Sequence, residues 1–225
     1  MPEIIKIVGD SVQYIREEVI REVGVDSFVA NIEKNMGRDT GILPRGCLYM
    51  KTEGGKCVYL IEVQAGLVPV TYKDGRGNRS NLMISIPFTQ FYLSCNYGSE
   101  TILNAHLTVT KTPLVDINQE VFIAPYLNIF SNGEGEVCTG SMSVPQNVSL
   151  KLKVEAFVSG FFEADFNADL TPTTFAPVGV FENAQKYLKK WAEFTSKDRF
   201  FSCSKDAVYY KHPKTPMQII EEGLK

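Results

Sequence analysis

A chain of 225 residues is long enough to bury one sizeable core, and its length fits one domain with extensions. Its composition, 44% hydrophobic and 22% charged, excludes wholesale disorder. The formal net charge of -3 gives no general positive field for a phosphate backbone, so we expect a globular protein that does not bind nucleic acid.

The sequence predicts a cytosolic protein without membrane contact, because it has no apolar stretch of about 18 residues and no pattern typical of a secretion signal. The cysteines are scattered, odd in number and without a Cys-x-x-Cys pair, and only two histidines accompany them. This pattern favours reduced thiols over a disulfide framework, a metal site or another cofactor site. The cysteines are Cys47, Cys57, Cys95, Cys138 and Cys203.

The first periodic segment predicts a helix over Ser11–Val23, where Val12 and Val19 belong to a set of apolar residues at helical spacing. Gly24 is a suitable residue for its end. A shorter helix is predicted over Asp26–Asn35. We therefore expect an N-terminal helical segment over residues 1–42.

Alternating apolar and polar residues then predict strands, and the Gly54–Gly55 turn between the first two is typical of a tight hairpin. The glycine-containing stretch over residues 73–80 is expected to be an exposed turn. The pattern predicts an antiparallel meander. Its strands are expected at Cys47–Lys51, Lys56–Gln64, Val68–Tyr72, Asn81–Ile86, Phe91–Asn96 and Ile102–Lys111.

Residues 121–145 contain too many prolines, glycines and asparagines for regular structure and predict a long ordered loop, a kind of segment that often carries function. Helical spacing then favours helices over Val148–Glu163 and Phe181–Phe194. A last short helix should begin at Thr215, with Pro216 at its first position and Gly223 as its stop.

The order of these elements predicts an α+β fold, in which helices are segregated from an antiparallel sheet. We divide the chain into residues 1–42, a core over residues 43–170, and a helical C-terminal extension over residues 171–225. Trp191 is expected to anchor the last long helix to the sheet, and His212, before Pro213, is expected at the surface.

Three short motifs follow one another in the predicted core. Leu43-Pro44-Arg45-Gly46 precedes the first strand, Ile86-Pro87-Phe88 lies near the middle, and Asn128 precedes Gly135-Glu136-Val137-Cys138-Thr139-Gly140. Their order over about residues 43–163 resembles the ubiquitin-conjugating enzymes. It is more similar still to their prokaryotic relatives of family D and of the PRTRC system protein B type, which accompany JAB-type peptidases and ThiF-type activating enzymes.

The resemblance implies a ubiquitin-conjugating-like fold and a transferase in which Cys138 accepts the C-terminus of a ubiquitin-like protein as a thioester. It implies a ThiF-type activating enzyme as the donor and a JAB-type peptidase as a further partner. Asn128 would donate its amide N–H to the oxyanion of the reaction. Alternatively, its amide would only close the loop by bonding to the backbone.

The chemistry of the Cys138 segment agrees with that role. Acyl transfer requires a thiol that both attacks and leaves, in a place that the donor thioester can reach. Gly135 and Gly140 allow the backbone to bend tightly around the sulfur. Carboxylates at Glu134 and Glu136, if they approach the sulfur, would raise its pKa, which disfavours a redox sensor or a papain-like protease.

Two departures from the family keep alternatives open. Tyr126 and Leu127 stand where the eukaryotic enzymes have His and Pro before the asparagine. In addition, no acidic residue after Cys138 aligns with the one that deprotonates the incoming amine. The alternatives are a catalytically inactive scaffold of the same fold, which binds a ubiquitin-like protein or a JAB-type peptidase, and a phage or plasmid accessory protein. The histidine that could approach Cys138 in space as a base is His106.

Overall fold

The computed structural model describes residues 4–8, 11–15, 19–24, 43–130, 134–140, 142–167 and 183–225. The chain divides into two compact units, Met1–Leu43 and Pro44–Lys225. In the first unit, three strands form an antiparallel sheet in chain order. They are β1 (Ile4–Val8), β2 (Ser11–Ile15) and β3 (Val19–Gly24).

The helix predicted over Ser11–Val23 is wrong, because this segment supplies β2 and β3, in which Val12 pairs with Val23. The spacing of the valines suits a helix, but β-branched residues such as Val12 and Val19 fit a pleated strand better. A short apolar pattern of this kind does not separate one helix from two short strands. The helix predicted over Asp26–Asn35 lies outside the described residues.

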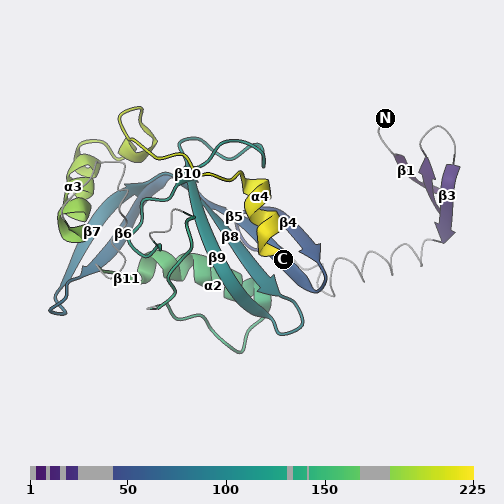
Figure 1. The fold of residues 1–225 in the computed structure, drawn as a ribbon, viewed down its shortest axis with the longest axis horizontal. Helices are drawn as coiled ribbons and strands as arrows, with labels where there is room; N and C mark the ends of the chain where they lie inside the picture. Colours follow the sequence, from purple (N-terminus) through teal and green to yellow (C-terminus); the bar gives the residue numbers. More distant parts are fainter. Residues whose placement is uncertain are drawn as a thin grey trace. The chain divides into compact units, whose positions relative to one another are not determined.

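The second unit is built on a five-stranded antiparallel sheet with the order β10-β9-β8-β5-β4 (Figure 1). Each strand lies within about three residues of its predicted position, apart from the two-residue β10, which falls in the predicted loop. The strands are β4 (Cys47–Glu53), β5 (Lys56–Val63), β8 (Phe88–Asn96), β9 (Thr101–Thr110) and β10 (Phe122–Ile123).

The meander is interrupted by a hairpin that belongs to a second sheet. β6 (Gly66–Lys73) and β7 (Arg79–Ile86) pair with each other, and β11 (Asp165–Phe166) adds to β6 in parallel. Consequently β5 pairs with β8, the strand after the hairpin. The chain changes sheets at Pro87, which has no N–H to give to a continuous ladder.

Three α-helices and one short 3-10 helix complete the described part of the second unit. α2 (Leu150–Glu163) and α3 (Ala184–Lys197) match two of the predicted helices. α4 (Pro216–Gly223) begins and ends as predicted, with Thr215 and Gln218 forming a capping box at its start. The 3-10 helix is η1 (Phe201–Cys203).

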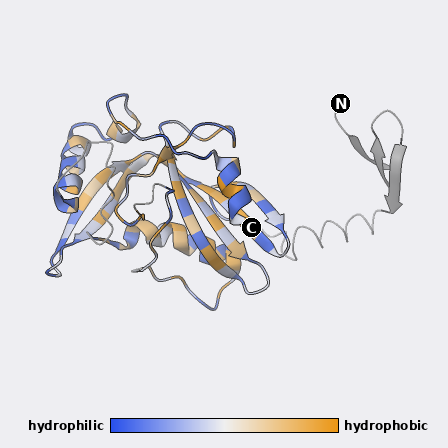
Figure 2. Ribbon diagram, in the orientation of Figure 1, coloured by the Kyte–Doolittle hydropathy of each residue, from blue (hydrophilic) through white to orange (hydrophobic). Residues whose placement is uncertain are grey.

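The five-stranded sheet is covered on both faces, by α2 on one and by α4 on the other, as Figure 1 shows. The alternation in β5 follows from this arrangement. Tyr59 and Ile61 enter the main core that includes α2, whereas Val58 and Leu60 enter a smaller core with Ile220 of α4. Figure 2 shows the hydrophobic residues concentrated on these central strands and the hydrophilic ones on the loops.

α3 packs on β7, and its residues are part of the main core. Trp191 is fully buried and stacks on Tyr126 with ring centroids 6.0 Å apart, which confirms its predicted anchoring role. Ser85 of β7 donates its backbone N–H to Thr195 of α3 at 2.9 Å. The described part of the C-terminal region therefore closes the same core as the sheet.

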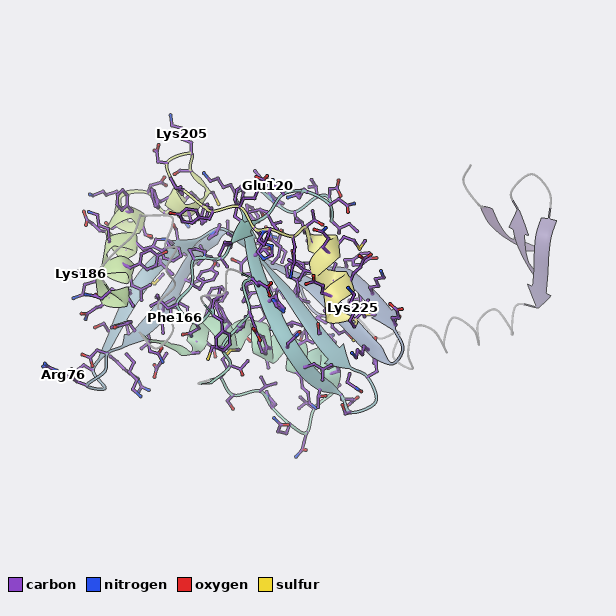
Figure 3. All side chains as sticks on the ribbon, viewed as in Figure 1. Arg76, Glu120, Phe166, Lys186, Lys205 and Lys225 are labelled. Carbon is purple, nitrogen blue, oxygen red and sulfur yellow. The ribbon has the colours of Figure 1, made fainter. Side chains whose placement is uncertain are left out.

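The α+β fold class is confirmed for the second unit. The turn between β6 and β7 is exposed as predicted, and Figure 3 shows Arg76 at its tip pointing into solvent. Phe166, at the start of the path from α2 toward α3, is fully buried. Among the described residues, none of the helices has the length and apolar character needed to cross a membrane.

Candidate functional site

The outer edge of β9 carries a small ladder that positions the Cys138 segment. Leu107 donates its backbone N–H to the carbonyl of Gly135 at 2.8 Å, and Val137 donates to the carbonyl of Ala105 at 2.9 Å. On its far side, the segment over residues 136–138 pairs with residues 128–130, with Ile129 opposite Val137. The predicted irregular loop is thus tied to the sheet by backbone bonds.

Gly135 is required by this close approach. Its φ is 77°, in the left-handed region that favours glycine. A Cβ at this position would overlap the carbonyl of Leu107 in β9. The expectation that a glycine lets the chain bend before Cys138 therefore has a specific cause, which is contact between two backbones.

Asn128 and Cys138 are direct neighbours across the ladder, because the register that pairs Ile129 with Val137 places them opposite each other. The backbone N–H of Cys138 donates to the carbonyl of Asn128 at 2.9 Å. Directly opposed residues of this kind have Cβ atoms about 5 Å apart. The Asn128 side chain is buried, and its amide donates a long bond of 3.5 Å to the carbonyl of Asp165.

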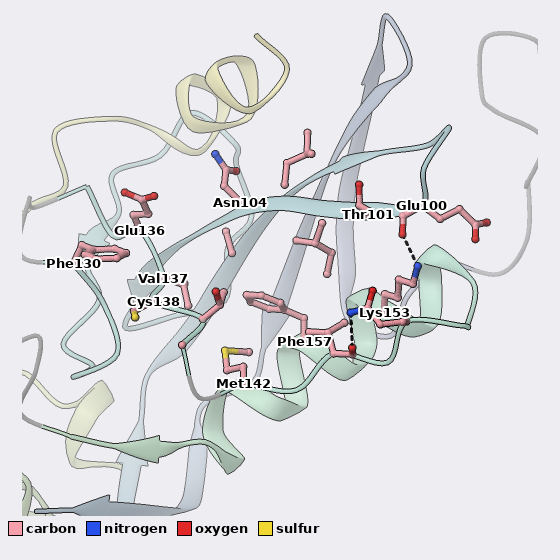
Figure 4. Close-up of a pocket in the computed structure, with 17 residues that line it drawn as sticks. Glu100, Thr101, Asn104, Phe130, Glu136, Val137, Cys138, Met142, Lys153 and Phe157 are labelled. Atoms are coloured by element: carbon pink, nitrogen blue, oxygen red, sulfur yellow. Dashed lines mark hydrogen bonds between the residues drawn. The ribbon is translucent and has the colours of Figure 1, made fainter.

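A pocket of about 510 Å³ lies beside Cys138. Its lining comes from β9, from the Cys138 segment and from α2, which contributes Lys153 and Phe157. Figure 4 shows Cys138, Glu136 and Phe130 at one end of the pocket and Glu100 with Lys153 at the other. The half-buried Cys138 thus faces an open space large enough for an extended peptide segment.

The charged side chains of the pocket differ in whether they have a hydrogen-bond or ion-pair partner. Lys153 donates its Nζ to the carbonyl of Glu100 at 2.7 Å, so its charge is held at the far end. Near Cys138, the Glu136 side chain has neither an ion pair nor a hydrogen bond within the described part of the chain. An acidic group therefore stands near the thiol without a compensating partner.

The segment before Cys138 is braced by the C-terminal region. His106 Nδ1 and His212 Nε2 lie 3.3 and 3.2 Å from the carbonyl oxygen of Glu134, which accepts from both rings. Lys214 Nζ forms ion pairs with the carboxylates of Glu134 and Glu222 at 3.2 and 2.7 Å. The hydrogen bond that Lys214 donates to Glu222, together with the pairing with Glu134, raises the pKa of Lys214.

The prediction that His212 is a surface residue is wrong, since it is 2% exposed. Sequence alone gave little indication of its position, because its partner, Glu134, is 78 residues away in the chain. His106 also binds the Glu134 carbonyl, and it is not among the residues that line the pocket. Neither histidine is therefore arranged as a general base for Cys138.

All five cysteines are free thiols, and their surroundings differ. Cys57 and Cys95 are fully buried and lie opposite each other on β5 and β8. Burial raises the pKa of Cys47 and of Cys203, and contact with Cys57 together with burial raises the pKa of Cys95. Cys138 differs from the other four in that it lines the pocket.

No cluster of three or more His, Cys, Asp or Glu side chains suited to hold a metal ion occurs in the portion of the chain that the structure describes. The pocket residues that sequence analysis did not identify include those contributed by β9 and α2. Their participation depends on long-range packing, and the sequence pattern marks Phe157 only as one apolar position of a helix.

Part of the chain is similar to a known family. Residues 105–198 match the model of the family described as Prokaryotic E2 family D. The matched segment contains Asn128, Cys138, α2 and α3, whereas Leu43-Pro44-Arg45-Gly46 and Ile86-Pro87-Phe88 lie outside it. The predicted resemblance to the prokaryotic ubiquitin-conjugating-like proteins is thereby confirmed. No curated protein and no solved structure matched the chain.

Proposed function

Because residues 105–198 match the prokaryotic E2 family D, we propose that this protein is a thioester carrier for a ubiquitin-like protein. Cys138 receives the C-terminus of that protein from a ThiF-type activating enzyme and passes it to an acceptor. The observation that carries the proposal is the position of Cys138 at one end of a pocket of about 510 Å³. Such a carrier works in the cytosol, where thiols remain reduced.

The loading step is an exchange between two thiols. The Cys138 thiol loses its proton, and its sulfur attacks the carbonyl carbon of the donor thioester. The new carbon–sulfur bond forms at Cys138 as the bond to the donor sulfur breaks, and the donor leaves as a thiol. The half-buried state of Cys138 supports this role, because its sulfur must be reached by the donor and then shielded from water.

The pocket offers a path for the tail of the ubiquitin-like protein. Thr101–Asn104 of β9 line it, and among the described residues this part of the strand has no partner on its outer side. An open strand edge can bind an extended peptide through backbone hydrogen bonds. A tail bound there would run toward Cys138 and deliver its terminal carboxyl to the sulfur.

The test is to incubate the protein with its activating enzyme, ATP and the ubiquitin-like protein. We expect an adduct that a thiol reductant removes, that Cys138→Ala lacks and that Cys138→Ser converts to a reductant-resistant ester. Cys203→Ala is the matched control, since Cys203 is also half-buried but lies outside the pocket. Absence of any adduct with the authentic partners would overturn the proposal.

A scaffold without chemistry is the second candidate. It is favoured by the Asn128 amide, which bonds to the carbonyl of Asp165 and does not line the pocket. On this reading the fold binds a ubiquitin-like protein or a JAB-type peptidase, and Cys138→Ser leaves both binding and biological output unchanged. Loss of the output with intact binding would exclude the scaffold.

A further inference from the structure

The start of α2 departs from the usual chemistry of a helix start. It carries Lys151 and Lys153, its first turn has no acidic residue, and the N-cap, Ser149, makes no side-chain capping bond. Helix starts usually carry capping or acidic groups, because the free N–H groups there give this end a partial positive charge. Two lysines at the same end are unfavourable unless an anion lies nearby.

Of the two lysines, Lys153 is the one that lines the pocket. The residue is only 7% exposed, and Figure 4 shows it at the end of the pocket away from Cys138. Its Nζ donates to the carbonyl of Glu100 at 2.7 Å, which uses one of its three N–H groups. Glu100 itself is exposed, and no carboxylate in the described part of the chain forms an ion pair with Lys153. A charge buried to this extent is costly unless an anion pairs with it.

The ladder fixes how far Lys153 lies from the thiol. The Cys138 segment pairs antiparallel with β9, in a register that places Cys138 beside Asn104. Glu100, whose carbonyl binds Lys153, lies four residues before Asn104. Because an extended chain rises about 3.3 Å per residue, the two ends of the pocket are on the order of 13 Å apart along this edge.

We infer that Lys153 pairs with an acidic side chain in the tail of the ubiquitin-like protein, at the fourth residue before its terminal residue. The inference rests on the proposed function, because it requires the end of the tail to reach Cys138. An extended tail with its last residue at Cys138 spans the distance to Lys153 in those four residues. A carboxylate there meets an unpaired positive charge, whereas a basic side chain meets a charge of its own sign.

The acidic residue at the other end of the pocket sharpens this selection. Glu136 lines the pocket beside Cys138 and has no partner within the described residues. It repels an acidic residue placed next to the end of the tail. The pocket therefore distinguishes tails by the position of an acidic residue as well as by its presence.

The test uses the full chain and three N-acetylated peptides. Ser-Glu-Ser-Ser-Gly-Gly has its glutamate four residues before the end, and Ser-Gln-Ser-Ser-Gly-Gly lacks the charge. Ser-Ser-Ser-Glu-Gly-Gly has the composition of the first peptide with the glutamate moved next to the glycines. As unreactive amides, the peptides are compared in binding by NMR titration. As thioesters of mercaptoethanesulfonate, they are compared by intact mass in their initial rates of loading, with Cys138→Ala as the background from the other four thiols.

Two protein variants assign the effect to one lysine. Lys153→Met removes the charge and keeps a long side chain in the buried site. Lys151→Met is the matched control, because Lys151 carries the same charge on the same helix but does not line the pocket. Thermal unfolding establishes that both variants are folded. The comparison of the three peptides on the unmodified protein does not depend on either variant.

We expect the first peptide to bind and to load on the order of 10-fold better than the other two, as for a hydrogen bond between charged groups. Lys153→Met should lose this preference and Lys151→Met should keep it. Equal or absent binding of the three amides by the unmodified protein, or a preference that persists in folded Lys153→Met, would overturn the role of Lys153. If the amides show the preference but Cys138 is not loaded even by the authentic partners, the proposed function is overturned and the acid-binding site at Lys153 is supported by itself.

Discussion

Asn128 and Cys138 are joined by a backbone hydrogen bond of 2.9 Å between the Cys138 N–H and the Asn128 carbonyl. This bond fixes the position of Cys138 along the ladder, although nine residues of chain lie between the two, part of them outside the described residues. The backbone thus brings the two residues that the sequence analysis singled out next to each other. The role of the Asn128 side chain is a separate question, which a variant can answer.

If the Asn128 amide leaves the Asp165 carbonyl to donate to the oxyanion, Asn128→Ala should slow discharge of loaded Cys138 to lysine and to hydroxylamine alike, because both reactions pass through the same oxyanion. The expected loss is on the order of 100-fold, as for other single oxyanion donors. Rates per loaded molecule, measured by intact mass, check this. If the amide only closes the loop against Asp165, thermal stability will fall while the rates stay the same.

Gly135→Ala should destabilise the protein by at least about 2 kcal/mol, from left-handed strain and from overlap with the Leu107 carbonyl. Gly54→Ala is the control, because Gly54 also has a positive φ, of 56°, but nothing lies within 4 Å of its added Cβ. Its cost should be only about 1 kcal/mol. Urea unfolding of both variants measures the difference, and equal costs would refute the close approach.

Trp191→Ala should cost about 3–5 kcal/mol, since it empties a fully buried site between α3 and Tyr126. Phe200→Ala removes an aromatic ring that is 54% exposed and should change stability little. Denaturant midpoints with unchanged slopes would measure both effects. A small loss for Trp191→Ala would mean that α3 is peripheral to the core.

The difference in free energy of unfolding between the unmodified protein and the Asp165→Asn variant, here called the gap, should depend on pH. Arg79, bonded to Asp165 at 2.8 Å, lowers the pKa of this carboxyl. A lowered folded-state pKa stabilises the fold above the unfolded value of about 3.9, and this contribution is lost as pH falls through the folded pKa. The Arg79 side chain is 65% exposed and solvent screens the pair, so the gap should be small near neutral pH and should disappear in acid.

The pKa of Glu193 is also lowered, by hydrogen bonds from Lys190 and Lys197, but this does not affect the comparison of the unmodified protein with Asp165→Asn. It titrates in both proteins, so its contribution cancels in their difference. Unfolding midpoints at a series of pH values from neutral to about 3 give the gap. A gap that stays constant over this range would show that the Arg79 pair does not contribute.

Much of the fold of the second unit could be predicted because local physical rules decide it. The β9 segment alternates apolar residues such as Leu107 and Val109 with polar ones, and the capping box of Thr215 and Gln218 marks the start of α4. The separate sheet of β6, β7 and β11 was not predicted, because it depends on the chain passing from one sheet to the other at Pro87. The alternation of apolar and polar residues along a strand does not predict which strands pair with each other.

The candidate site could be predicted only in part from the sequence, because it too depends on which segments become neighbours. The glycines around Cys138 indicated a bent backbone, and Gly135 is indeed in contact with Leu107. The pocket requires β9, α2 and the Cys138 segment to meet, and they come from distant parts of the chain. The sequence marked Glu136 only as a charge near the sulfur. It could not show that Lys214 pairs with Glu134 and leaves Glu136 without a partner among the described residues.

The bracing of Glu134 by His212 and Lys214 has a practical consequence for recombinant work. An expression fragment that stops at Asp198, where the family match ends, would omit both braces. A negative labelling result from such a fragment would carry no information about Cys138. Cloning should therefore keep Pro44–Lys225 as one piece, and an affinity tag is better fused upstream than next to Lys225, whose carbonyl binds Lys56.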